Sequence, residues 1–213
     1  MKIGVKAFQH INKDKIRILV FPLLGLLLLL VIGVANHHLF TSRSGSVIYT
    51  YAASFAKGDI GTGYGSPSPG MVPFSQLEPG DIVLGGWPNT AYGQFSHSGL
   101  YLGDHKVLEG YVDYGLSIQD LSTYEHYSRI CLLRVNAPVQ VKANAVTYAL
   151  GEEKKMFYPL AFKSGDRLWN CTKIIWRAYA DQEIDLDEIG DLWIAPESLA
   201  QSRWVSVIYE KGI

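Results

Sequence analysis

The sequence predicts an α+β domain behind a single apolar N-terminal helix. Runs of strand character, separated by turns, occupy most of the region 81–135, and one further strand is expected near the C-terminus. Segments with helical spacing follow Pro138 and Asn170. A group of strands followed by a few separate helices is typical of α+β proteins. The 213 residues, of which 48% are hydrophobic, are sufficient for one domain with a sizeable core.

The N-terminal region has the charge pattern of a membrane anchor. Residues 1–17 form a basic lead, and residues 18–35 are apolar and carry no charge. A run of this length is near the minimum for crossing a bilayer, and a basic lead places the N-terminus in the cytoplasm. We therefore expect a single-pass, signal-anchored cell-membrane protein whose catalytic domain lies outside the cytoplasm. The alternative is a signal peptide cleaved after the small residues at 33–35, which leaves a secreted or periplasmic protein.

The segment 36–71 is expected to be a linker, and the domain itself is expected to cover 72–213. Within the linker, Val47, Tyr51 and Phe55 have helical spacing in a short stretch at 46–57, and a run rich in Gly, Ser and Pro follows at 58–73. His37 and His38 are adjacent and have no nearby partner in the sequence. We interpret them as linker or membrane-interface residues rather than metal ligands.

The strands of the domain are separated by recognisable turns. Residues 77–81 have Pro and Gly at turn positions, and residues 103–106 form a second, very short turn. Two strands around so short a turn form an antiparallel hairpin. Strands are expected at 81–87, 96–103, 106–111, 114–118, 129–135 and 204–209.

Helices are expected at 139–150, after Asn170, and as a short turn at 196–202. Asn170 is a good N-cap residue, and Cys171, Ile174, Ile175 and Ala178 follow it at helical spacing. The segment 119–127 is helical or turn-like, 151–167 is irregular, and 181–193 is an acidic loop.

Cys171 is the candidate nucleophile because it lies in the first turn of its helix. The partial positive charge of a helix N-terminus favours the thiolate, and the free N–H groups of the first turn are placed to stabilise an oxyanion. The alternative is a small buried side chain, as for most free cysteines. The other cysteine, Cys131, lies in an expected buried strand. Neither belongs to a CxxC pair, and we expect neither a structural zinc site nor a disulfide.

His97 and Glu109 are the candidates for the base and for the group that orients it. His97 opens an apolar strand at the end of the expected hairpin, and Glu109 is an acid within the other apolar strand. The hairpin brings them to opposite or nearly opposite positions, within reach of a carboxylate–imidazole hydrogen bond. A surface or capping histidine and a solvent-facing glutamate are the alternatives. With Cys171 the two complete a Cys–His–Glu set.

Four motifs, taken in order, resemble the permuted papain-like hydrolases of the YiiX/YebB type, within the wider NlpC-type superfamily. The motifs are GDIVL at 80–84, SHSGLYLG at 96–103, VLEG at 107–110 and NCTKIIWRAY at 170–179. The strand with the histidine precedes the helix with the cysteine, as in the permuted branch. The resemblance covers about residues 72–210 and includes residues 195–199 and the closing strand.

The resemblance implies a circularly permuted papain-like (NlpC-type) fold with a barrel-like antiparallel sheet packed on the cysteine helix. It implies Cys171 as nucleophile, His97 as base and Glu109 as third member. A tyrosine after the cysteine lies near the site in that family, and Tyr179 is the nearest match here. Tyr179 is two helical turns beyond Cys171, a place that also suits a core residue. Residues 158–162 read Tyr-Pro-Leu-Ala-Phe and lack the acid of the family's Tyr-Asp-x-x-Phe pattern.

The expected activity is hydrolysis of an amide or peptide bond through a thioester, with cell-wall peptides as the natural target outside the cytoplasm. Acyl transfer or thioester hydrolysis on lipids is the alternative that the resemblance suggests, and a non-catalytic binding module is a third. No cofactor and no metal are expected. The net charge of −1, with no basic cluster beyond residue 17, argues against a nucleic-acid partner. The second oxyanion donor and the oligomeric state are left open.

Overall fold

The computed structural model describes residues 13–35, 47–67 and 70–213 of the chain. The chain divides into two compact units, Met1–Thr41 and Ser42–Ile213. His37 and His38, together with the first part of the basic lead, lie outside the described residues.

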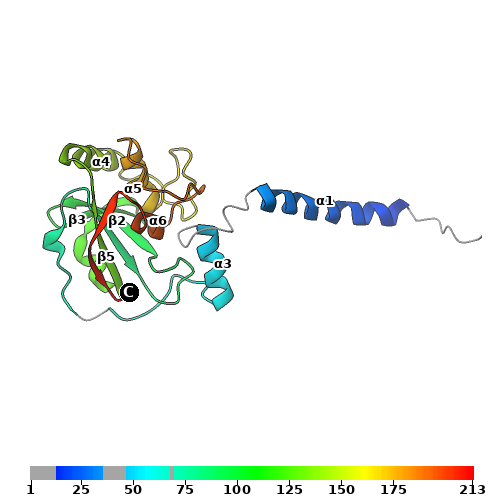
Figure 1. The fold of residues 1–213 in the computed structure, drawn as a ribbon, viewed down its shortest axis with the longest axis horizontal. Helices are drawn as coiled ribbons and strands as arrows, with labels where there is room; N and C mark the ends of the chain where they lie inside the picture. Colours follow the sequence, from blue (N-terminus) through cyan, green and yellow to red (C-terminus); the bar gives the residue numbers. More distant parts are fainter. Residues whose placement is uncertain (1–12, 36–46, 68–69) are drawn as a thin grey trace, which may run out of the picture. The chain divides into compact units, whose positions relative to one another are not determined.

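The described part of the first unit is one helix, α1 (Lys13–Ala35), which covers the apolar run at 18–35 (Figure 1). Of the residues that the structure describes, none belongs to a helix that is both long and apolar enough to cross a membrane. The transmembrane helix expected from the sequence is therefore not found in this part of the chain, and the cellular location stays a prediction.

The second unit is built on a six-stranded antiparallel sheet with the strand order β4-β3-β2-β1-β5-β6. Each strand expected from the sequence is present; two have the predicted bounds, and the others differ by a few residues at their ends. The strands are β1 (Ile82–Gly86), β2 (His97–Gly103), β3 (Lys106–Tyr111), β4 (Gly115–Asp120), β5 (Arg129–Val135) and β6 (Val205–Lys211).

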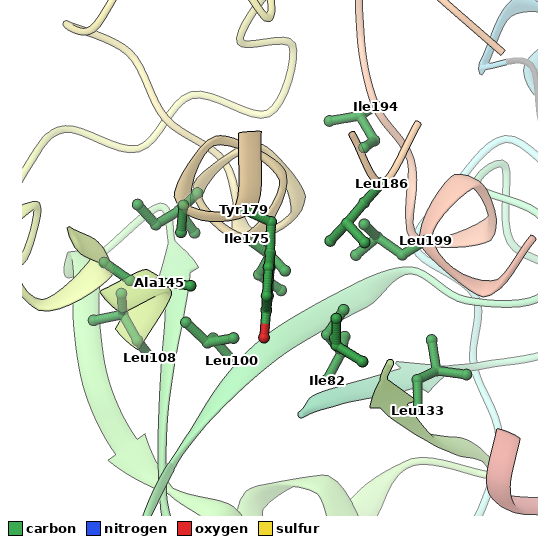
Figure 2. Packing of buried hydrophobic residues seen from close by; sticks show 14 of the residues in the cluster. Ile82, Leu100, Leu108, Leu133, Ala145, Ile175, Tyr179, Leu186, Ile194 and Leu199 are labelled. Atoms are coloured by element: carbon green, nitrogen blue, oxygen red, sulfur yellow. The ribbon is translucent and has the colours of Figure 1, made fainter. Parts of the chain in front are cut away.

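Both faces of the sheet are covered, which explains why its central strands are apolar without alternation. Because side chains alternate along a strand, Ile82 and Leu84 enter one buried cluster and Val83 enters the other. The first cluster lies under α4 (Val139–Gly151) and α5 (Cys171–Ala180), which pack against each other and against β2. Figure 2 shows Tyr179 pointing from α5 toward the sheet. The second cluster contains side chains of η1 (Phe74–Gln76) and η2 (Leu121–His126).

Helix α3 (Val47–Lys57) belongs to the same compact unit as the sheet, although it lies in the segment 36–71 that the sequence assigns to a linker. Val47 and Thr50 are buried. The backbone N–H of Val47 donates to Oδ2 of Asp191 at 3.0 Å. This bond fastens the start of α3 to the acidic loop that precedes α6 (Pro196–Ala200).

The register of β2 and β3 positions the candidate base and its orienter. Tyr101 pairs with Val107. His97 and Glu109 each lie an even number of residues from this pair, so both side chains project from the same face of the sheet. Continuing the register places Glu109 diagonal to His97 rather than directly opposite. Diagonal neighbours are within reach of long side chains, so the nearly opposite placement expected from the hairpin holds.

Candidate active site

Cys171 is the first residue of α5, as the capping signal predicts. Asn170 has extended backbone angles, and its Oδ1 accepts hydrogen bonds from the N–H groups of Thr172 at 3.1 Å and Lys173 at 2.7 Å. Its Nδ2 donates to the carbonyl of Pro159 at 3.2 Å, which ties the cap to the preceding loop. Asn170 therefore sets both the start of the helix and the position of the thiol.

His97 and Glu109 form a buried pair. Nε2 of His97 lies 2.8 Å from Oε2 of Glu109, and the two residues are 6% and 0% exposed. Because this contact uses Nε2, the other ring nitrogen, Nδ1, is the one left to exchange a proton with the thiol. The structure thus brings together Cys171, His97 and Glu109 from α5, β2 and β3.

The thiol and the imidazole each shift the other toward its charged form. Burial by itself raises the pKa of Cys171, but the charge and hydrogen bond of His97 outweigh burial and lower this pKa below its ordinary value. Burial by itself lowers the pKa of His97, but the Cys171 charge and hydrogen bond, followed by those of Glu109, raise it. These directions favour a thiolate–imidazolium pair near neutral pH.

Two further neighbours of the thiol, Thr172 and Ser98, stabilise the thiolate. The Thr172 hydroxyl lies 3.7 Å from the Cys171 sulfur, and hydrogen bonds from this hydroxyl and from the Ser98 backbone lower the pKa of Cys171 further. The hydroxyls of Ser98 and Thr172 lie 3.2 Å apart, so β2 and α5 are joined next to the nucleophile.

Three tyrosines stack around His97, and sequence reasoning did not single them out. The ring centroids of Tyr111, Tyr124 and Tyr127 lie 4.5, 5.8 and 6.2 Å from that of the imidazole, with interplanar angles of 26°, 29° and 18°. The high tyrosine content indicates an aromatic cleft, but it does not say which tyrosines form it. Tyr111 is the last residue of β3, Tyr124 lies in η2, and Tyr127 follows η2 directly. Only the fold brings these elements together.

Gly110 packs closely against the nucleophile's backbone. A Cβ at this position would lie 2.8 Å from Cδ2 of Phe157 and 3.3 Å from the nitrogen of Cys171. The Cys171 N–H is the first of its helix and has no partner within the helix. This N–H is therefore the candidate donor for an oxyanion formed at the thiol.

A cavity of about 350 Å³ opens at Cys171 and His97. Among the described residues that line it there is no Asp, Glu, Lys or Arg. Its walls are largely apolar and aromatic, and they come from α3, from the strand ends and from the loops on both sides of α5. The main apolar and aromatic lining residues are Val47, Tyr51, Trp87, Tyr92, Tyr111, Val112, Tyr127, Phe157, Leu160, Trp193 and Ile194.

Tyr179, the fourth residue suggested by the sequence, is not brought to the cavity. Its side chain is 0% exposed and belongs to the first core cluster (Figure 2). Its hydroxyl donates to the carbonyl of Gly80 at 2.5 Å, at the turn before β1. Two helical turns separate it from Cys171, so it points into the sheet rather than toward the thiol. Its place is that of a core residue.

Cys131 is buried in β5, and neither cysteine forms a disulfide. Burial raises the pKa of Cys131 to about 12, the reverse of the shift at Cys171. Among the described residues, no three His, Cys, Asp or Glu side chains are grouped so as to hold a metal ion.

No protein-family model and no curated protein matches the chain. Among solved structures, the chain is similar to the crystal structure of metalloprotein YiiX from Escherichia coli O157:H7, with a TM-score of 0.54 and 13% sequence identity. The similarity covers 64% of this chain and 98% of that chain. At this identity the likeness shows the fold alone. The α+β domain therefore has a YiiX-like fold, as the ordered motifs predict.

Proposed function

We propose that this domain is a papain-like, NlpC-type cysteine hydrolase that cleaves an amide or related acyl bond through a thioester on Cys171. The observation that carries the proposal is the buried Cys171–His97–Glu109 arrangement. A thiol with a lowered pKa, an imidazole with a raised pKa and a carboxylate 2.8 Å from that imidazole are the parts that nucleophilic catalysis requires. A buried structural cysteine needs none of these partners.

The reaction has two halves in this mechanism. The Cys171 thiolate attacks the carbonyl carbon, and the negative charge moves to the carbonyl oxygen near the Cys171 N–H. The intermediate collapses, and the leaving group departs with a proton from Nδ1 of His97. In the second half, His97 takes a proton from water, the hydroxide attacks the thioester, and the thiolate is released. Glu109 stabilises the imidazolium while it carries the proton.

The substrate has two candidates. A peptide of the cell wall is the amide expected outside the cytoplasm. The cavity favours the second candidate, an acyl ester or thioester, because its walls are apolar and its described lining has no charged Asp, Glu, Lys or Arg to pair with a charged peptide group. Each buried CH₂ of an acyl chain contributes about 0.8 kcal/mol. An acyltransferase or thioesterase on the same fold is therefore the alternative.

The N-terminal residues support a location for this activity. The basic lead and the apolar run at 18–35 favour attachment to the cell membrane with the domain outside the cytoplasm. Both candidate substrates are within reach there. The composition gives no support for a nucleic-acid partner.

The decisive test compares two cysteine variants of the full chain. Replacing Cys171 with Ala removes the nucleophile, and turnover should fall by roughly 10³-fold or more with the fold retained. Cys131→Ala is the matched control, because it also removes a buried thiol but one remote from the cavity. Turnover should be measured by mass spectrometry, with circular dichroism to monitor folding. Equal turnover in the two variants would refute the assignment of Cys171 as the nucleophile. A folded wild-type protein that has no reactive thiol would indicate a binding module.

The same assay separates the two substrate classes. Peptidoglycan-derived peptides and acyl esters of increasing chain length are offered in parallel. If the apolar cavity holds the acyl group, kcat/KM should rise about fourfold for each added CH₂, the equivalent of 0.8 kcal/mol, until the cavity is full. Activity confined to the peptides would instead support the amidase.

A further inference from the structure

Tyr124 differs from the other two tyrosines that stack on His97. It is 0% exposed and lies in η2, on the face of the sheet from which His97 and Glu109 project. Its ring supports the imidazole at 5.8 Å, while its hydroxyl is enclosed in the protein interior. A buried hydroxyl without a hydrogen bond is costly, so it needs a partner.

β2 leaves a space for this hydroxyl. A Cβ at Gly99, two residues after His97, would lie 2.6 Å from Oη of Tyr124 and 3.3 Å from its Cζ. No side chain larger than hydrogen fits there unless the rigid tyrosine ring moves. The position of the hydroxyl is therefore built into the strand that carries the base.

Glu109 has a matching unused acceptor. Its Oε2 is occupied by His97, whereas its Oε1 is buried. Within the described part of the chain, neither Glu109 Oε1 nor Tyr124 Oη makes a hydrogen bond in the structure, so each is a buried polar atom in need of a partner. Burial raises the pKa of Tyr124 well above its ordinary value, and the charge of Glu109 raises it further. The hydroxyl is thus a permanent donor beside a buried carboxylate.

We propose that Tyr124 donates a hydrogen bond through Oη to Oε1 of Glu109 and acts as a positioning residue for the Cys171–His97–Glu109 site. The inference rests on the proposed function. The bond stabilises the negative charge of Glu109 and holds Oε2 against the imidazole. A carboxylate held against the imidazole favours the imidazolium, and the imidazolium favours the thiolate. Tyr124 therefore acts on the nucleophile through two intervening residues.

The test measures the pH dependence of Cys171 alkylation by iodoacetamide in the full chain, followed by peptide mass spectrometry. Tyr124→Phe keeps the ring and removes only the donor. At pH values below the wild-type midpoint it should slow labelling about tenfold, the effect of one pKa unit, and it should converge with the wild type at alkaline pH. That convergence separates a loss of thiolate from a loss of structure. Cys131, whose pKa is raised to about 12 by burial, serves as an internal reference.

Two further variants make the result specific. Gly99→Ala retains the hydroxyl but displaces it, so it should shift the profile in the same direction as Tyr124→Phe. Tyr179→Phe also removes one buried hydroxyl, which bonds to Gly80 in the core, and should leave the profile unchanged. A His97→Ala variant shows whether labelling depends on the imidazole. If the Tyr124→Phe profile coincides with that of Tyr179→Phe, and His97→Ala slows labelling, the role of Tyr124 is refuted and the proposed function stands. If the wild type and His97→Ala are labelled equally, both the role of Tyr124 and the proposed function are refuted.

Discussion

At the scale of single residues, the site depends on the burial of His97 between a thiol and a carboxylate. Its Nε2 contacts Glu109 at 2.8 Å, and its raised pKa arises from the charges on both sides, which outweigh burial. The thiolate and the imidazolium are each disfavoured by burial alone, so each depends on the other. Removing Glu109 should therefore change the ionisation of both His97 and Cys171.

The pH profile of kcat/KM should show this dependence. Activity needs the thiolate, so it rises through the lowered pKa of Cys171, and it needs the imidazolium, so it falls through the raised pKa of His97. Glu109→Gln removes the charge that supports the imidazolium, so the alkaline limb should move to lower pH and the plateau should fall. Glu125→Gln, on the exposed part of η2, is the control. Superimposable profiles for the two variants would contradict the role of Glu109.

At the scale of elements, the N-terminus of α5 places the nucleophile. Asn170 satisfies two N–H groups of the first turn and is itself held by the carbonyl of Pro159. The cap is local, because all of its contacts on the helix lie within three residues. This is why the start of α5 at Cys171 was predictable from the sequence.

Asn170→Ala should loosen this first turn. Loss of an N-cap costs about 1 kcal/mol of stability, measurable as a lower urea midpoint with an unchanged m value. Because the thiol sits in the frayed turn, labelling of Cys171 near neutral pH should also slow. Asn170→Ser, which keeps an acceptor, should recover most of both losses. Asn144→Ala removes an exposed asparagine of α4 whose side chain bonds to Gln140 and Gln182, and it should leave labelling unaffected; slowed labelling there would argue against a local effect of the α5 cap.

At the scale of the whole molecule, a buried ionic network joins the sheet to α4. Asp81 is 0% exposed and accepts from Nε of Arg134 at 3.0 Å and from Nζ of Lys142 at 2.7 Å. It also accepts from the backbone N–H of Glu78 at 2.9 Å. These contacts connect the turn before β1, strand β5 and helix α4, and none of the residues involved lines the cavity.

Replacing Asp81 with Ala leaves Lys142 buried without its closest partner. Removing one member of a buried ion pair costs about 3–5 kcal/mol, so urea unfolding should shift by that amount. The variant that remains folded should keep the pH profile of Cys171 labelling, because the network touches no residue of the cavity. Asp113→Ala, at an exposed turn, should change stability by less than about 0.5 kcal/mol. A loss at Asp81 no larger than at Asp113 would contradict this account.

The sequence by itself determined the strands, the two helices that begin after Pro138 and Asn170, and the order of His97, Glu109 and Cys171 along the chain. Each rests on a pattern of a few neighbouring residues: an apolar run, a turn, a cap or an acid within an apolar strand. The hairpin placed His97 and Glu109 close together for the same reason, since its short turn leaves little freedom of register.

Only the tertiary structure decided the surroundings of these residues. It placed Tyr179 in the core, gathered Tyr111, Tyr124 and Tyr127 around His97, and made α3 a wall of the cavity rather than part of a linker. Side chains from separate elements converge according to sheet curvature and helix packing, which no local pattern encodes. The largely apolar cavity and the hydroxyl beside Gly99 exist only because distant segments close on the same imidazole.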